Sequence, residues 1–149
     1  MTQNDSAHSG WPRAVAGAAS GTAAGVVSGA VPARLDMLPS LALPLGSHST
    51  VLGALVHLTI SASLGALFAS YLGPTTHLRD VITGSVLFGA IWWIVIPVLL
   101  IPAWLSQNTD IAVVEFALMS LAGQAIYGPA NGFVLYLLIR RRARSTRCP

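Results

Sequence analysis

Two polar side chains, His57 and Gln124, interrupt long apolar stretches of this sequence and have the clearest capacity for chemistry. A histidine among apolar membrane residues is costly to bury, so it usually faces a protein interior, where it can relay protons near neutral pH. The alternative is a neutral imidazole that hydrogen-bonds Ser61 or a neighbouring helix, and we favour this alternative. Ser61 and Gly65 follow His57 at i+4 and i+8, so a helix would place all three on one face.

Gln124 and Asn131 share one face of another predicted helix with Gly128 and Gly132. Amide side chains inside a membrane hydrogen-bond across helices, and each such bond is typically worth about 0.6–2 kcal/mol. Structural bridging is therefore the default interpretation of both amides. A polar cavity between the helices that carry His57 and Gln124 is the alternative.

Trp92 and Trp93 fall near the middle of a third apolar stretch, whereas tryptophan in membrane proteins is enriched at the interfaces. They can flank a pigment, a quinone or a lipid tail, although simple packing is their ordinary role. His57 would be the only histidine inside the membrane, so haem ligation has little support and we predict no cofactor. The sequence has no metal-ligand cluster, phosphate-binding loop or nucleophile–base pair, and we predict neither a metal site nor an enzyme.

The composition indicates that lipid is the solvent. The 149 residues are 54% hydrophobic and 9% charged, with a mean hydropathy of +0.68, whereas soluble domains carry about 25% charged residues. The net charge of +3 comes from arginines that cluster beside predicted spans, so we predict no nucleic-acid partner. The single cysteine, Cys148, forms no internal disulfide, and nothing in the sequence assigns it a role.

Four predicted transmembrane helices position these residues. They cover residues 14–33, 51–72, 81–104 and 112–139, between a cytoplasmic tail at 1–13 and a basic tail at 140–149. Pro39 and Pro44 break the segment 34–50, whose leucines suggest a short interfacial cap over the bundle. The expected fold is an all-α membrane protein in which the four helices form two packed hairpins. A secretory signal is the competing interpretation of the first stretch.

Glycines at regular spacing predict close helix packing, since small residues let two helix backbones approach within a membrane. The spacing is better explained by packing than by a secretory signal, and it makes the first helix the most protein-buried of the set. The predicted packing positions are Gly17, Gly21, Gly25, Gly65, Gly128 and Gly132.

The arginines predict the orientation, because positively charged residues favour the cytoplasmic side of a membrane. Only Arg34 falls on the outer side, whereas Arg13, Arg79 and the C-terminal arginines fall on the side of both termini. Both termini are therefore predicted to be cytoplasmic, in a prokaryotic cytoplasmic membrane.

An internal duplication is an open interpretation of the two predicted hairpins. An ungapped offset of 67 residues aligns Gly17 with Gly84, His57 with Gln124, and Gly65 with Gly132. The two halves would have the same orientation, related by an axis along the membrane normal. His57 and Gln124 would then lie at similar depths and face each other across the interface between the halves.

Three runs resemble those of a loose family of small four-span prokaryotic membrane proteins without an established activity. They are HLTISASLGALF at 57–68, GSVLFGAIWW at 84–93 and SLAGQAIYG at 120–128. The resemblance implies a fold and a location in the cytoplasmic membrane, and it implies no reaction. Members of that family often have a histidine where this chain has Gln124, which puts a paired-histidine site here in doubt.

Three functional classes follow from these observations. We favour a non-catalytic accessory or scaffold subunit, held to other membrane proteins or to its own copies by glycine faces. The first alternative is a small oligomeric transporter or channel with a polar seam around His57, Gln124 and Asn131. The second alternative is a membrane-embedded binder of a lipid, quinone or pigment near Trp92 and Trp93.

Overall fold

The computed structural model describes residues 5–73, 77–100 and 113–145, and every element in these ranges is helical. The prediction of an all-helical fold is confirmed. The four long helices are α1 (Asp5–Ser28), α4 (Thr50–Tyr71), α5 (Leu78–Trp93) and α7 (Val113–Ser145). The shorter elements are α2 (Ala30–Arg34), α3 (Leu38–Ala42), the 3-10 turn η1 (Leu43–Leu45) and the π-helical segment η2 (Ile94–Leu100).

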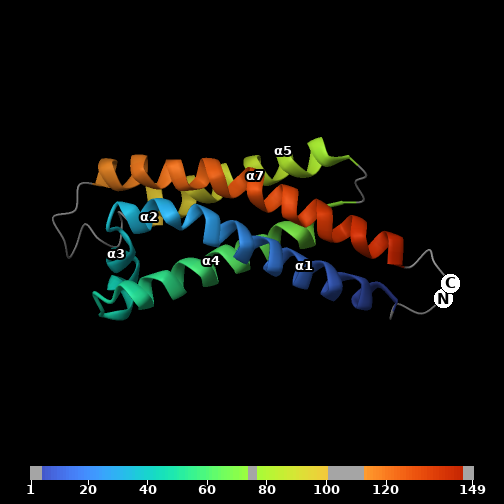
Figure 1. The fold of residues 1–149 in the computed structure, drawn as a ribbon, viewed down its shortest axis with the longest axis horizontal. Helices are drawn as coiled ribbons and strands as arrows, with labels where there is room; N and C mark the ends of the chain where they lie inside the picture. The colour runs from blue at the N-terminus through green and yellow to red at the C-terminus, as the bar shows by residue number, and fades with distance from the viewer. Residues whose placement is uncertain (1–4, 74–76, 101–112, 146–149) are drawn as a thin grey trace.

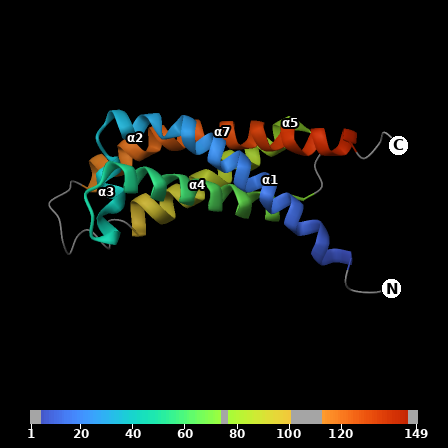
Figure 2. The ribbon, with the colours of Figure 1, turned by 60° about the horizontal axis from the view of Figure 1, so that its bottom comes forward.

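The long helices lie lengthwise in an antiparallel bundle, with α1 and α7 at its centre (Figure 1). α4 packs against α1, and α5 packs against α7. α3 crosses one end of the bundle and packs on α4, whereas both termini lie at the opposite end (Figures 1 and 2). We call these the α3 end and the terminal end.

Glycine contacts bring the backbones of α1 and α4 together. A Cβ atom added at Gly17 would collide with the carbonyl oxygen of Gly65, and one at Gly21 would collide with the carbonyl oxygen of Ser61. Gly65 faces the backbone of Gly17 and Gly21 in return. The two helices therefore depend on missing side chains for their separation.

Glycines also allow close packing between α5 and α7. A Cβ atom at Gly128 would lie 3.0 Å from the Cα of Val86, and one at Gly132 would lie 2.8 Å from the Cα of Ile82. Five of the six glycines predicted for packing meet the backbone of another helix, and Gly25 meets the side chain of Ser61, so they hold the bundle's own helices together.

Three helical stretches are long and apolar enough to cross a membrane, namely Arg13–Arg34, Thr50–Tyr71 and Leu78–Ile96. These helices are compatible with a membrane protein. Large apolar side chains are exposed along their outer faces, among them Val27, Leu55 and Ile91. α7, the predicted fourth span, has 33 residues and is not one of the three stretches.

The helix bounds differ from the predicted ones at several places. α1 begins at Asp5, so much of the segment expected to be a loose tail is helical, and α7 continues to Ser145 through the predicted basic tail. α5 ends at Trp93, and the chain continues as η2, which contains Pro97. Proline has no N–H to donate to the α-helical ladder, which explains why the regular winding stops near it. Residues 101–104 and 112 of the predicted spans, and Cys148, lie outside the described residues.

Apolar side chains fill the terminal end of the bundle. The buried cluster takes one or two residues from each long helix, and its members are Ala16, Phe68, Ala69, Val81 and Leu135. The tilted rings of Phe68 and Phe88, with centroids 5.5 Å apart, join α4 to α5 beside this cluster. The interior toward the α3 end contains a cavity instead.

Candidate functional site

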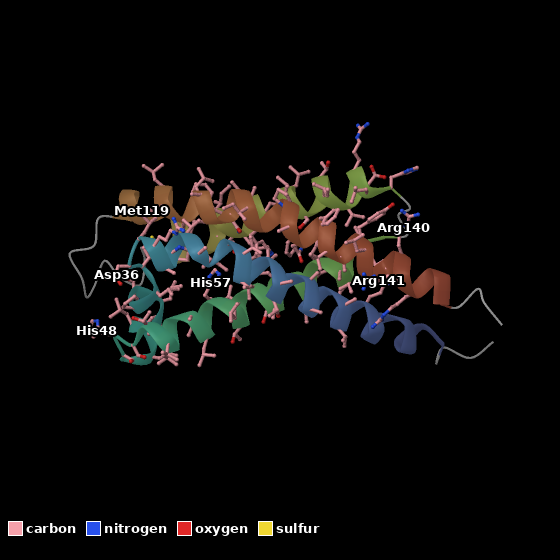
Figure 3. All side chains as sticks on the ribbon, in the orientation of Figure 1. Asp36, His48, His57, Met119, Arg140 and Arg141 are labelled. Atoms are coloured by element: carbon pink, nitrogen blue, oxygen red, sulfur yellow. The ribbon has the colours of Figure 1, made fainter. Side chains whose placement is uncertain are left out.

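A cavity of about 140 Å³ lies between α4, α5 with η2, and α7. Ser28, Pro32 and Leu41 border it from α1, α2 and α3. Figure 3 places the labelled His57 and Met119, which both line the cavity, in the half of the bundle nearer α3. Its lining also includes Ser61, Trp92, Trp93, Gln124 and Tyr127.

The cavity exists because α4 and α5 each pack on a different central helix. α4 lies along α1, and α5 lies along α7. α4 and α5 therefore approach each other closely only where aromatic rings fill the space between them. Phe88 contacts Phe68 on one side and Trp92 on the other, with centroid distances of 5.5 and 6.2 Å. Beyond Trp92 the space remains open, and Gly123 on α7 adds no side chain to fill it.

His57 reaches from α4 to α1. Its Nε2 lies 3.1 Å from the carbonyl oxygen of Gly25. A carbonyl oxygen only accepts, so Nε2 carries the proton and donates it, and Nδ1 of the neutral ring is an acceptor. The predicted bond from His57 to a neighbouring helix is thus present, with Gly25 rather than Ser61 as the partner, and the neutral state of the ring stays a prediction.

Gln124 makes the corresponding bond in the second hairpin. Its Nε2 donates to the carbonyl oxygen of Gly89, on α5, at 2.9 Å. In each hairpin, a polar side chain on the second long helix thus bonds the carbonyl of a glycine on the first. The offset is 124 − 57 = 67 residues for the side chains and 89 − 25 = 64 for the glycines. The sequence alignment with a single offset misses this three-residue difference.

Trp92 and Trp93 both line the cavity. Trp93 also donates from Nε1 to Oγ of Ser120 on α7, at 3.0 Å. In the sequence, the two tryptophans were candidates separate from the pair His57 and Gln124, and the structure brings all four to one space. Ser61 joins them at the cavity wall, although its side chain is almost fully buried.

Asn131 does not line the cavity. Its side chain is 1% exposed, accepts a hydrogen bond from Ser20 Oγ at 2.8 Å, and donates one to Ser85 Oγ at 3.0 Å. This network ties α7 to α1 and α5, which is the bridging role expected of a buried amide. The predicted polar seam is therefore divided, with Asn131 separate from His57 and Gln124.

Three residues of this region were missed by sequence reasoning, namely Ser20, Ser85 and Tyr127. Tyr127 lines the cavity, and its hydroxyl donates to the carbonyl oxygen of Ser61 at 2.7 Å, which links α7 to α4. Its position midway between Gln124 and Asn131 on the same helical face was a usable signal. The serines had no such signal, because serine is common in apolar helices.

The chemistry of the site is that of uncharged recognition. The described residues that line the cavity include no Asp, Glu, Lys or Arg. Within residues 5–73, 77–100 and 113–145, no three His, Cys, Asp or Glu side chains come together as a metal site would require. Apolar walls with a few placed polar groups are typical of small-molecule sites.

The fold and the cavity together define an all-helical protein that is compatible with a membrane and has a largely apolar internal site. No protein-family model, curated protein or solved structure matches the chain.

Proposed function

We propose that this protein is a four-span integral membrane protein that binds a small, uncharged, largely apolar molecule between α4, α5 and α7. The observation that carries this proposal is that His57, Gln124, Trp92 and Trp93 all line one cavity. Scattered packing residues have no reason to converge in this way. Of the three classes that the sequence leaves open, the geometry best supports the membrane-embedded binder.

The cavity volume limits what the ligand can bury. An apolar cavity of about 150 Å³ engineered in another protein binds benzene, and the cavity here measures about 140 Å³. One six-membered ring, or a few methylene groups of a chain, fits such a space. The ligand classes that satisfy this limit are a quinone-type ring, part of a pigment or a lipid tail, with the remainder outside the cavity.

Variants that fill or spare the cavity test the proposal. Gly123 lines the cavity, and a Cβ atom there would meet nothing closer than Ser28 O at 3.9 Å, so Gly123→Leu directs its added atoms into open space. Gly73→Leu is the matched control, because a Cβ at Gly73 meets nothing within 4 Å and the residue is exposed outside the cavity.

The measurement is solvent extraction of the purified protein followed by mass spectrometry of the extract. We expect a compound enriched over bulk lipid in the wild type and in Gly73→Leu, and lost in Gly123→Leu. Equal extracts from all three proteins would contradict the proposal.

The accessory-subunit class stays a prediction, with its support reduced. Its main argument was a set of glycine faces available to partners, and Gly17, Gly21, Gly65, Gly128 and Gly132 contact the chain's own helices. The native mass after gentle solubilisation tests it directly. Co-migrating chains would restore this class, and those partners would name the function.

The transporter class has less support from the geometry. The apolar cluster that includes Phe68 and Leu135 lies between the cavity and the terminal end, and Asn131 is enclosed by its two serine partners. A polar path within one chain therefore stops at the cavity. A flux through liposomes that His57→Ala abolishes would revive this class.

Four spans and a duplicated hairpin are part of the proposal. α7 lies beside α5 and α1 for much of their length, so a bilayer that encloses these helices encloses α7 as well (Figure 1). The paired bonds of His57 to Gly25 and of Gln124 to Gly89 support the duplication.

The charge distribution supports an orientation with both termini in the cytoplasm. Arg140 and Arg141 lie at the terminal end in Figure 3, and Arg13 and Arg79 begin the spans that start there. Arg34 lies at the other end, where α2 finishes. A reporter fused at Ser47 should be exported from the cytoplasm of a bacterial host, and a cytoplasmic reporter would overturn this orientation.

A further inference from the structure

Two side chains of the cavity wall each keep a hydrogen-bond acceptor that has no partner among the described residues. His57 uses Nε2 for the carbonyl of Gly25, and Gln124 uses Nε2 for the carbonyl of Gly89. Among the described residues, no partner exists for Nδ1 of His57 or for Oε1 of Gln124. Both residues line the cavity.

The bonds to Gly25 and Gly89 determine which atoms of His57 and Gln124 act as donors and which remain as acceptors. Because Gly25 and Gly89 offer carbonyl oxygens, each side chain must turn a donor toward its glycine and keep its acceptor for other partners, and the amide of Gln124 also keeps its second N–H. Tyr127 adds a third acceptor, since its hydroxyl hydrogen is given to Ser61 and its oxygen lone pairs remain. An acceptor left unpaired in an apolar site costs about 1–3 kcal/mol, so a ligand that donates to it is favoured over one that cannot.

The walls also exclude charged ligands. Among the described residues that line the cavity, a carboxylate or phosphate would meet no basic side chain, and an ammonium group would meet no carboxylate to neutralise it. Placing an uncompensated charge in such a space is costly. The ligand class that remains is a neutral molecule that donates a hydrogen bond.

We infer that the ligand presents a neutral hydroxyl on a ring-sized group, as a phenol or quinol does, and that this hydroxyl donates to Nδ1 of His57 and accepts from the remaining N–H of Gln124. This inference rests on the proposed function, because it names the chemical class for the same cavity. It separates the phenol or quinol form from the corresponding ketone or quinone, because a ketone or quinone has no hydrogen to donate to Nδ1 of His57.

A matched pair of test ligands isolates the hydroxyl. 4-Fluorophenol and 4-fluorotoluene differ by OH against CH₃ and are otherwise alike in size. Both are titrated into the full chain in lipid nanodiscs, with binding followed by the ¹⁹F NMR signal and corrected with empty nanodiscs. The phenol is expected to bind about three- to tenfold more tightly, which is the range for one neutral hydrogen bond.

Side-chain variants then test whether His57 and Gln124 are the residues that bond the ligand hydroxyl. His57→Leu and Gln124→Leu should each reduce 4-fluorophenol affinity by about three- to tenfold and leave 4-fluorotoluene affinity unchanged. His57→Gln keeps one donor for Gly25 and one acceptor for the ligand, so it should retain the preference for the phenol. His48→Leu is the control, because His48 is exposed before α4 and does not line the cavity.

The outcomes separate this inference from the proposed function. If neither ligand binds above the empty-nanodisc level, both this inference and the proposed function are wrong. If both ligands bind equally to the wild type, the cavity binds apolar rings and the inference about the hydroxyl is wrong. The comparison in the wild type remains decisive even if one leucine variant does not fold.

Discussion

Ser20 and Asn131 are 111 positions apart in the chain, and the Oγ of Ser20 donates to Oδ1 of Asn131 at 2.8 Å in the buried centre of the bundle. Nδ2 of Asn131 in turn donates a hydrogen bond to Oγ of Ser85 on α5. Three helices therefore meet at one amide. This bond belongs to the contact between α1 and α7, which joins the first hairpin to the second.

Replacing Asn131 by leucine should weaken this junction. Each interhelical hydrogen bond in a membrane contributes about 0.6 kcal/mol on average and at most about 1.7 kcal/mol, so Asn131→Leu should lower the free energy of unfolding by about 1–3 kcal/mol. Reversible unfolding in mixed micelles measures the change. Thr59→Val is the control, because Thr59 is exposed and bonds only Leu55 of its own helix. Equal stability of both variants would show that the network contributes nothing.

Glycine substitutions should separate helix contact from helix propensity. Gly65→Ala puts a methyl group against the backbone of Gly17 and should cost about 1–3 kcal/mol, as overpacking does. Gly89→Ala places its methyl 3.8 Å from Gln124 Nε2, which is an ordinary contact, and gains up to about 1 kcal/mol of helix propensity. Thermal unfolding should rank Gly89→Ala at or above the wild type and Gly65→Ala below it. The reverse order would refute the close approach of α1 and α4.

The paired bonds of the two hairpins predict that His and Gln are interchangeable at position 124. Gln124→His can still donate a ring N–H to the carbonyl of Gly89, so its unfolding free energy should stay within about 0.5 kcal/mol of the wild type. Gln124→Leu loses the bond and should cost about 0.6–1.7 kcal/mol. Chemical unfolding of the three proteins in one micelle composition makes the comparison. If histidine destabilises as much as leucine, the two hairpins do not use equivalent bonds.

The tyrosine hydroxyls offer a test of the link between α7 and α4. Tyr127→Phe removes the 2.7 Å bond to the carbonyl of Ser61 and should cost about 0.6–1.7 kcal/mol, while keeping the ring in place. Tyr136→Phe is the matched control, since its hydroxyl accepts from the exposed Arg140 on the same helix and contributes little. Similar unfolding midpoints for both variants would contradict a structural role for Tyr127.

Local patterns in the sequence were sufficient for the helices and for much of their packing. The four-residue spacing of Gly17, Gly21 and Gly25 marked a face of α1, and His57 and Gln124 stood out because polar residues are rare among apolar ones. Such signals lie within one helix, so they report which face is unusual. They do not report which helix that face meets.

The cavity and the central network needed information that periodicity does not contain. Trp92 and His57 line the same space only because α4 and α5 diverge beyond Phe88, a consequence of each helix packing on a different neighbour. Ser20 became a bridging residue only when α1 met α7. Periodicity likewise did not predict that the chain would continue after α5 as the π-helical segment η2.

Both ends of the chain lie at the same end of the bundle. A second copy can therefore be joined head-to-tail through a linker without reversing its direction or adding a crossing helix. Genes that encode such concatemers would fix the number and order of copies in an assembly. One altered cavity could then be placed beside an intact one within a single polypeptide.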